Sequence, residues 1–172
     1  MVGQVIATLV HSAVSEVVVV TGGKRKDVEQ ALIQLPPNWP VRFVFNPDFA
    51  SGEMLSSLQA GIVALSERFE ATLLALGDQP QIEGGVVQAV LAAYHQKGAR
   101  LVVPSYQMRR GHPLLLHRSL WAEIMALRSP QTLRDLLQAH ADQIHYVVVD
   151  TSSVLQDVDT PADYQKFRPS RR

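Results

Sequence analysis

The chain has 172 residues, and its 16 Lys plus Arg balance 16 Asp plus Glu, so the formal net charge is zero. Zero net charge argues against nucleic acid or an anionic membrane as a partner, and the length fits one domain with a sizeable core. The absence of cysteine excludes disulfides, a thiolate zinc site and a cysteine nucleophile. The sequence shows neither a transmembrane run nor a signal peptide. We therefore expect a cytoplasmic domain.

Short apolar runs alternate with helical patterns along the chain. The apolar runs lie at 16–20, 41–45, 71–77, 100–104 and 144–150. Unbroken runs of this length are typical of parallel strands that are buried on both faces. The helical patterns lie at 2–14, 25–35, 54–66, 84–97, 119–127 and 131–140. This alternation predicts βαβ units with right-handed crossovers, and therefore an α/β fold.

The segment 104–120 interrupts the alternation with a polar loop and a short apolar run. We expect a hairpin or insertion on one edge of the sheet. Its "RRGHP" stretch contains Arg109, Arg110 and His112, and guanidinium groups match the geometry of phosphate oxygens. The alternative is a solvated loop tip without a ligand.

Asp78 follows the apolar run 71–77, and Pro80 prevents the strand from continuing. Ligands of open parallel sheets bind outside the carboxyl ends of the strands, so Asp78 is a candidate ligand for Mg²⁺, which prefers oxygen donors. The alternative is a local turn or cap before the helix expected at 84–97.

A second acidic stretch, "LQDVDTPADY", lies near the C-terminus. Asp157 and Asp159 are two residues apart and would point to the same side of an extended segment. They are equally consistent with a second arm of a metal site and with a turn. Thr160 and Asp163 have the spacing of a capping box and predict the start of a C-terminal helix.

Ser56 and Ser57 lie in the first turns of the helix expected at 54–66, after a loop rich in Pro and Gly. Hydroxyls at a helix start suit phosphate or nucleotide binding, and they also suit ordinary capping. The stretch "TGGKRKD" at 21–27 lacks the spacing of a phosphate-binding loop and is interpreted as a turn.

In this order, "VVVVTGG", "SGEMLSSLQAGI", "LLALGDQP", "VVPSYQMRRGHPLLL" and "DVDTPADY" resemble the molybdenum cofactor cytidylyltransferase branch of the nucleotidyltransferases. That branch is similar to molybdopterin-guanine dinucleotide synthase. The resemblance covers residues 2–166 and implies a three-layer α/β/α, Rossmann-like fold of the sugar-nucleotide-transferase type, with a mostly parallel sheet. The domain would span residues 1–166, and a basic tail would follow at 167–172.

The resemblance implies a transfer of CMP from CTP to a phosphorylated molybdopterin, with release of pyrophosphate. Asp78 would hold the Mg²⁺ that bridges the nucleotide phosphates, and Asp157 or Asp159 would complete the metal site. The catalytic carboxylates would be Asp78 and Asp159. Such a transfer needs positioning and charge neutralisation but no covalent nucleophile.

The remaining site residues implied by the resemblance contact the two substrates. Ser56, Ser57 and Gly77 would join Asp78 in lining the nucleotide site. The residues facing the pterin would be Arg109, Arg110 and His112.

The resemblance also predicts a gap in the sheet. The family's first strand and its glycine-rich loop, L-A-A-G-x-S-x-R-M-G, precede the helix expected at 2–14, and that motif does not occur in this sequence. The strand lies between those expected at 16–20 and 71–77, so we expect two unpaired apolar edges there. Such edges aggregate or pair with another chain. Three alternatives follow: the true start of the chain lies upstream, the chain is a remnant, or a partner strand fills the gap, including one from a second copy in a homo-oligomer. Because the loop grips the triphosphate, an alternative function is a non-catalytic module that binds the cofactor or a molybdoenzyme during its maturation.

Overall fold

The computed structural model describes residues 1–172 except 52, 159, 161–162 and 164–172. The α-helices are α1 (Val2–His11), α2 (Arg25–Ala31), α3 (Glu53–Ala64), α4 (Gly84–Lys97), α5 (Trp121–Ala126) and α6 (Leu133–Ala139). The strands are β1 (Val17–Thr21), β2 (Val41–Phe45), β3 (Ala71–Leu74), β4 (Leu101–Tyr106), β5 (Arg109–Arg110), β6 (Leu114–His117) and β7 (Ile144–Val148). Short 3₁₀ turns lie at Arg118–Leu120, Ala141–Gln143 and Ser152–Leu155.

The strands form two sheets. β1 and β2 pair in parallel as a two-stranded sheet. The second sheet has five strands in the order β3-β6-β4-β5, and β7 pairs in parallel with the other side of β4. Within the described residues β1 and β3 are not paired with each other, so the sheet is divided where the sequence predicts unpaired edges.

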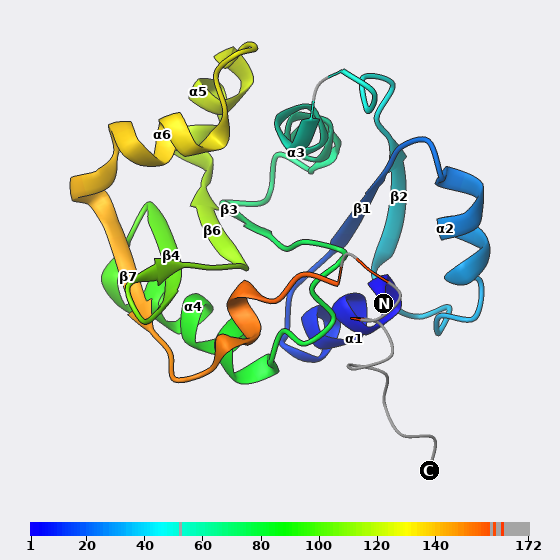
Figure 1. Ribbon diagram of the computed structural model, residues 1–172, viewed down its shortest axis with the longest axis horizontal. Coiled ribbons are helices and arrows are strands. Elements are labelled where there is room, and N and C mark those ends of the chain that lie inside the picture. The colour runs from blue at the N-terminus through cyan, green and yellow to red at the C-terminus, as the bar shows by residue number, and fades with distance from the viewer. Residues whose placement is uncertain (52, 159, 161–162, 164–172) are drawn as a thin grey trace.

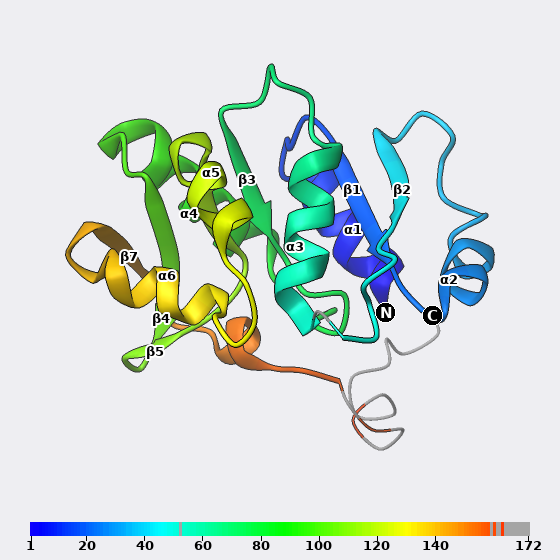
Figure 2. The same ribbon diagram turned by 90° about the horizontal axis from the view of Figure 1, so that it is seen from above.

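The helices cover both faces of the strands, which gives the predicted three-layer α/β/α arrangement (Figure 1). α1 and α4 lie on one face, and α3, α5 and α6 lie on the other, as Figure 2 also shows. The largest core cluster packs α3, α5 and α6 against β4 and β6. A second cluster packs α1 against β1. The mixed α/β fold class predicted from the sequence is confirmed. None of the described helices is long and apolar enough to cross a membrane.

The apolar runs form strands for a simple physical reason. Leu101, Val102 and Val103 of β4 are completely buried, because helices cover both faces of this strand. The helical pattern at 84–97 coincides with α4, which ends at Lys97 and has Gly98 as its C-cap. Gly98 has a φ of 60°, a left-handed conformation that glycine adopts without a steric penalty.

The predicted position of the 104–120 hairpin is wrong. β6 does not lie at an edge: it lies between β3 and β4 and pairs antiparallel with both. Leu114, Leu115 and Leu116 are almost fully buried, which an edge strand with one exposed face would not allow. β3 is also shorter than the expected 71–77. Its last pair is Leu74 with Leu114, and Pro113 has no N–H with which to extend the ladder.

Candidate active site

Three chain segments meet at the carboxyl end of β3. The segment after β3 is joined to the segment after β7, because the Val158 N–H donates to the Asp78 carbonyl at 2.9 Å. The segment before β6 is joined to the same stretch, because the His112 N–H donates to the Val154 carbonyl at 3.0 Å. Since β6 runs antiparallel to β3, its start lies at the edge where β3 ends. The candidate site is built on this edge.

Gln79 makes a side-chain link between the two acidic stretches. Its amide Nε2 donates to Oδ1 of Asp157 at 2.7 Å, across 78 positions in the sequence. Gln79 is only 3% exposed, and its other polar atom, Oε1, is buried without a partner among the described residues. A carbonyl oxygen in this state suits a hydrogen-bond donor or a cation supplied by a ligand. Gln79 therefore fixes Asp157 relative to Asp78 and leaves an acceptor at the same place.

Asp78 is half-buried and does not cap the next helix. α4 begins at Gly84 with Glu83 as its N-cap, and no side chain makes a capping bond there. Of the alternative interpretation, a local turn or a cap, the turn is present and the cap is not. The aspartate lies in the turn between β3 and α4, next to the exposed Gly77.

Only one of the two C-terminal carboxylates can be placed. Asp157 is exposed, with one oxygen bonded by Gln79, whereas Asp159 lies outside the described residues. In the part of the chain that the structure describes, no group of three or more His, Asp or Glu side chains is arranged to hold a metal ion. The capping box is present, because Thr160 and Asp163 exchange hydrogen bonds of 3.1 and 3.2 Å.

His112 lies beside Asp157 in a half-buried position. Burial lowers the pKa of His112, and the negative charge of Asp157 acts in the opposite direction. Its Nε2 atom is buried without a partner among the described residues. Because burial favours the neutral ring, His112 can offer one donor or one acceptor at neutral pH but carries little charge.

Gly111 brings His112 to this place by a close approach of two backbones. A Cβ atom on Gly111 would lie 2.6 Å from the Val154 carbonyl oxygen and 2.6 Å from the Val154 Cβ. Its N–H donates to the Pro104 carbonyl at 2.9 Å. Only glycine fits between β4 and the Ser152–Leu155 turn.

The arginines of "RRGHP" do not accompany His112. Both are exposed on β5, and the Arg110 Nε donates to the Tyr146 hydroxyl at 2.9 Å. Its guanidinium group also lies over the Tyr146 ring, 5.7 Å from the centroid. Arg110 is thus directed toward β7. The assignment of Arg109 and Arg110 to a second substrate stays a prediction.

Ser56 and Ser57 hold the loop between β2 and α3. Asn46, which is 2% exposed, donates its amide to the Ser56 hydroxyl at 2.8 Å and the Ser57 hydroxyl at 3.1 Å. The side-chain Oδ1 of Asn46 accepts from the Asp48 N–H at 2.9 Å. Through these bonds both serines stabilise the loop between β2 and α3. Contact of either serine with a nucleotide stays a prediction.

Comparison with known proteins identifies the family. The model of the MobA-like NTP transferase domain matches residues 1–144. The chain belongs to this family. It is therefore a nucleotidyltransferase-type enzyme, as the sequence predicts. The match does not show membership of the molybdenum cofactor cytidylyltransferase branch. No curated protein sequence matches the chain significantly.

Solved structures share the fold of this MobA-like chain at low sequence identity. Rv0371c of Mycobacterium tuberculosis in complex with manganese has a TM-score of 0.76 and 21% identity, covering 96% of this chain and 84% of its own. A nucleotidyl transferase from Methanothermobacter has a TM-score of 0.77 and 21% identity, with coverages of 97% and 78%. The 4-diphosphocytidyl-2C-methyl-D-erythritol synthase of Anaerococcus prevotii has a TM-score of 0.78 and 14% identity, with coverages of 96% and 85%.

Two residues of this MobA-like chain have roles that the sequence analysis did not assign. Gln79 stands directly after Asp78, and a polar residue before Pro80 in a buried turn was the available signal. Asn46 opens "NPD", in which asparagine commonly bonds the backbone two residues later. The local Asn46–Asp48 bond was therefore predictable, whereas the bonds to the serines depend on the tertiary fold.

Proposed function

We propose that this chain transfers CMP from CTP to the terminal phosphate of a phosphorylated molybdopterin. The observation that carries the proposal is the bond between Gln79 and Asp157, which holds a second carboxylate beside the Asp78 turn. The family supports nucleotidyl transfer, and the name of the Anaerococcus prevotii synthase includes a cytidyl group. The ordered sequence motifs around Asp78, His112 and Asp157 support the pterin substrate.

The reaction conserves all atoms without a covalent enzyme intermediate. An oxygen of the pterin's terminal phosphate attacks the α-phosphorus of CTP, and the bond from this phosphorus to the bridging oxygen of the β-phosphate breaks. Pyrophosphate leaves with that bridging oxygen and its electron pair. In the proposal the chain holds both substrates in line, and in such reactions positioning and charge neutralisation supply most of the catalysis.

The donor chemistry of the edge fits a hard divalent cation. Asp78 and Asp157 supply carboxylate oxygens, and the buried carbonyl of Gln79 adds a neutral oxygen acceptor. Mg²⁺ prefers such ligands and retains waters and substrate phosphates in its shell. We assign Asp78 and Asp157 to Mg²⁺, with Asp159 as the further candidate. The ion would neutralise the charge of the triphosphate. The manganese complex of Rv0371c is consistent with a divalent metal in this fold.

The test is cytidylyl transfer by the purified chain with Mg²⁺, with CTP, GTP, ATP and UTP compared as donors. We expect CTP to be the preferred donor, and we expect Asp78→Asn to reduce the rate on the order of 10²-fold. Asp142→Asn is the matched control, because Asp142 is an exposed aspartate in the Ala141–Gln143 turn. Isothermal titration with CTP and Mg²⁺ separates loss of binding from loss of turnover.

Two results would contradict the proposal. Equal rates for Asp78→Asn and Asp142→Asn would remove Asp78 from the site. Preference for another nucleotide would exclude a cytidylyltransferase. Tight binding of the pterin without turnover would favour the alternative function, a non-catalytic module that presents the cofactor to a molybdoenzyme.

A further inference from the structure

The turn after β1 contains two consecutive glycines for a steric reason. A Cβ atom on Gly22 would lie 2.7 Å from the Cβ of Phe49, and one on Gly23 would lie 2.9 Å from the Cε2 of the same side chain. Neither glycine has a φ in the left-handed region, so the backbone conformation does not require glycine here. The two glycines therefore make room for the Phe49 ring, which lies along their backbone.

Phe49 is exposed although its ring is closely held. The residue is 45% exposed, so the glycine backbone covers one side of the ring and solvent reaches the rest. An exposed phenylalanine is by itself ordinary, but each glycine lowers stability through the entropy of the unfolded chain. The partial burial of Phe49 is a small return for two of them. The arrangement is explained if the exposed side of the ring has a function.

Hydrogen bonds fix the loop that carries Phe49. The Asn46 N–H donates to the Thr21 carbonyl at 2.8 Å, which joins the loop to the end of β1. The Asn46 side chain accepts from the Asp48 N–H at 2.9 Å, and the Ser51 N–H donates to the Asp48 carbonyl at 3.1 Å. The ring is therefore pre-organised, and a ligand can contact it without the cost of ordering the loop.

The chemistry of the ring limits what it can bind. A phenyl ring has no hydrogen-bond donor or acceptor, so it recognises a ligand through its face, which attracts a second planar ring or a cation. The neighbouring Phe45 ring lies 6.1 Å away at 58°, and the Arg25 guanidinium group lies over Phe45, 5.7 Å from its centroid. Arg25 is also paired with Glu29 at 2.7 Å. A planar ring is the ligand group that the exposed side of Phe49 fits.

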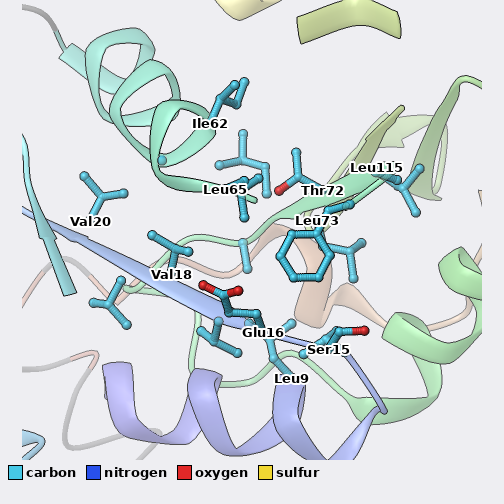
Figure 3. Close-up of a pocket in the computed structure, with 18 of the residues that line it drawn as sticks. Leu9, Ser15, Glu16, Val18, Val20, Ile62, Leu65, Thr72, Leu73 and Leu115 are labelled. Carbon is cyan, nitrogen blue, oxygen red and sulfur yellow. The ribbon is translucent and has the colours of Figure 1, made fainter. Parts of the chain in front are cut away.

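Phe49 lies on the same edge of the molecule as the candidate site. β1, β2 and β3 all end on the lower side of Figure 2, and the loop after β2 runs along this side to α3. A cavity of about 630 Å³ lies between β1 and β3, and Figure 3 shows part of its lining. The ends of these two strands therefore flank the cavity. An elongated ligand with phosphates at the Asp78 turn extends along this edge toward the Phe49 loop.

We propose that the Phe49 ring is the surface on which the base of the donor nucleotide stacks. The base is the planar part of a nucleoside triphosphate and lies at the opposite end from the phosphates. The inference rests on the proposed function, because it takes the phosphates of the same nucleotide to lie at the Asp78 turn. Every nucleobase has an aromatic face, so Phe49 supplies affinity for the base and does not select CTP.

Nucleotide binding to purified variants tests the proposal, by isothermal titration with CTP and Mg²⁺. Phe49→Leu keeps an apolar side chain and removes the aromatic face, and we expect it to weaken CTP binding about five- to hundredfold. Phe49→Tyr keeps the ring and should bind CTP within about twofold of the wild type. The matched control is Phe43→Leu on β2, a residue that is 37% exposed, and it should bind CTP as the wild type does.

A ligand without a base separates stacking from a structural role. Inorganic tripolyphosphate with Mg²⁺ carries the phosphates of CTP but no ring. We expect Phe49→Leu and the wild type to bind tripolyphosphate equally, because the substitution leaves the Asp78 turn intact. GTP, ATP and UTP should lose affinity in Phe49→Leu as CTP does.

A substitution at Gly22 tests the support of the ring. In Gly22→Ala the new Cβ occupies the place of the Phe49 Cβ and Cγ, so the ring must move. We expect a loss of CTP affinity similar to that of Phe49→Leu. The double variant should lose no more than Phe49→Leu alone, since both changes remove one interaction. If Gly22→Ala does not fold, the Leu and Tyr variants of Phe49 still decide the matter.

Three results would overturn the proposal. They are equal CTP affinity of Phe49→Leu and the wild type, an equal loss of tripolyphosphate affinity in Phe49→Leu, and a Phe49→Tyr protein as weak as Phe49→Leu. Transfer of CMP by a Phe49→Leu protein with unchanged CTP affinity would remove the stacking role and leave the proposed function in place. Conversely, CTP binding that depends on Phe49 without any transfer would support stacking and contradict the proposed function.

Discussion

Replacing Gly111 by alanine tests how the candidate site is assembled. The added Cβ would lie 2.6 Å from both the carbonyl oxygen and the Cβ of Val154, well inside the usual contact distance of about 3.5–4.0 Å. Val154 is completely buried, and one of the atoms it presents is main chain, so it cannot rotate away. The backbone of Gly111 is not in the left-handed region, and the effect is therefore purely steric.

The expected loss of stability is about 3–4 kcal/mol. Overpacking of a core typically costs about 1–3 kcal/mol, and the rigidity of the neighbour favours the upper half of this range. Loss of the 3.0 Å bond from the His112 N–H to the Val154 carbonyl adds about 1 kcal/mol. For a domain of this size, each kcal/mol lowers Tm by about 2–4 °C, so Tm should fall by roughly 6–16 °C.

The assay is urea and thermal unfolding of Gly111→Ala beside Gly85→Ala. A Cβ on Gly85 would meet nothing within 4 Å, and this residue lies in the first turn of α4. Alanine should stabilise the helix there by about 0.5–1 kcal/mol, so the two substitutions are expected to differ in sign. A Gly111→Ala protein within about 0.5 kcal/mol of the wild type would refute the close approach of the two backbones.

Two further predictions concern Asn46 and His112. Asn46→Ala removes the bonds to Ser56 and Ser57 and should lower the free energy of unfolding in urea by about 1–3 kcal/mol. The control is Asn38→Ala at an exposed position, which should stay within about 0.5 kcal/mol of the wild type. Equal values for the two variants would contradict the role of Asn46. Burial lowers the pKa of His112, so below pH about 6.5 the unfolded chain binds a proton that the folded chain resists, and stability falls as the pH decreases. His112→Gln should flatten this fall between pH 7.5 and 5.5 in metal-free buffer, and parallel pH profiles for the two proteins would contradict the assigned shift.

Much of the fold is predictable because its signals are local. Continuous apolar runs indicated the positions of β1, β2, β4 and β7. Burial on both faces explains the run only for β4, because β2 and β7 carry exposed residues. The 3.6-residue period and the following glycine gave α4. The position of β6 was not predictable, because an apolar run of four residues is compatible with an edge or with the centre of a sheet. Its place is determined by pairing with the nearby β4 and with β3, which is far away in the sequence.

The candidate site is predictable only in part, for a related reason. Asp78 and Asp157 could be named, because a carboxylate after an apolar run or in an acidic stretch is visible in the sequence. The hydrogen bond that connects the two acidic stretches could not be predicted, because the Gln79 amide and Asp157 are 78 positions apart in the sequence. The sequence also did not show that the side chains of Arg110 and His112 have partners in different parts of the fold. The two lie two residues apart, but Arg110 bonds Tyr146 whereas His112 is drawn to Val154.

The end of β3 determines where Asp78 lies, and this has a mechanical consequence. Gly77 follows the last residues of the apolar run and precedes Asp78 directly, so the position of Asp78 depends on how firmly the end of β3 is held. On one side β3 is held by β6, whose pairing ends at Leu74. Beyond that residue, the bonds from Val158 to Asp78 and from Gln79 to Asp157 hold the turn. These two bonds therefore determine how freely the turn that carries Asp78 can move.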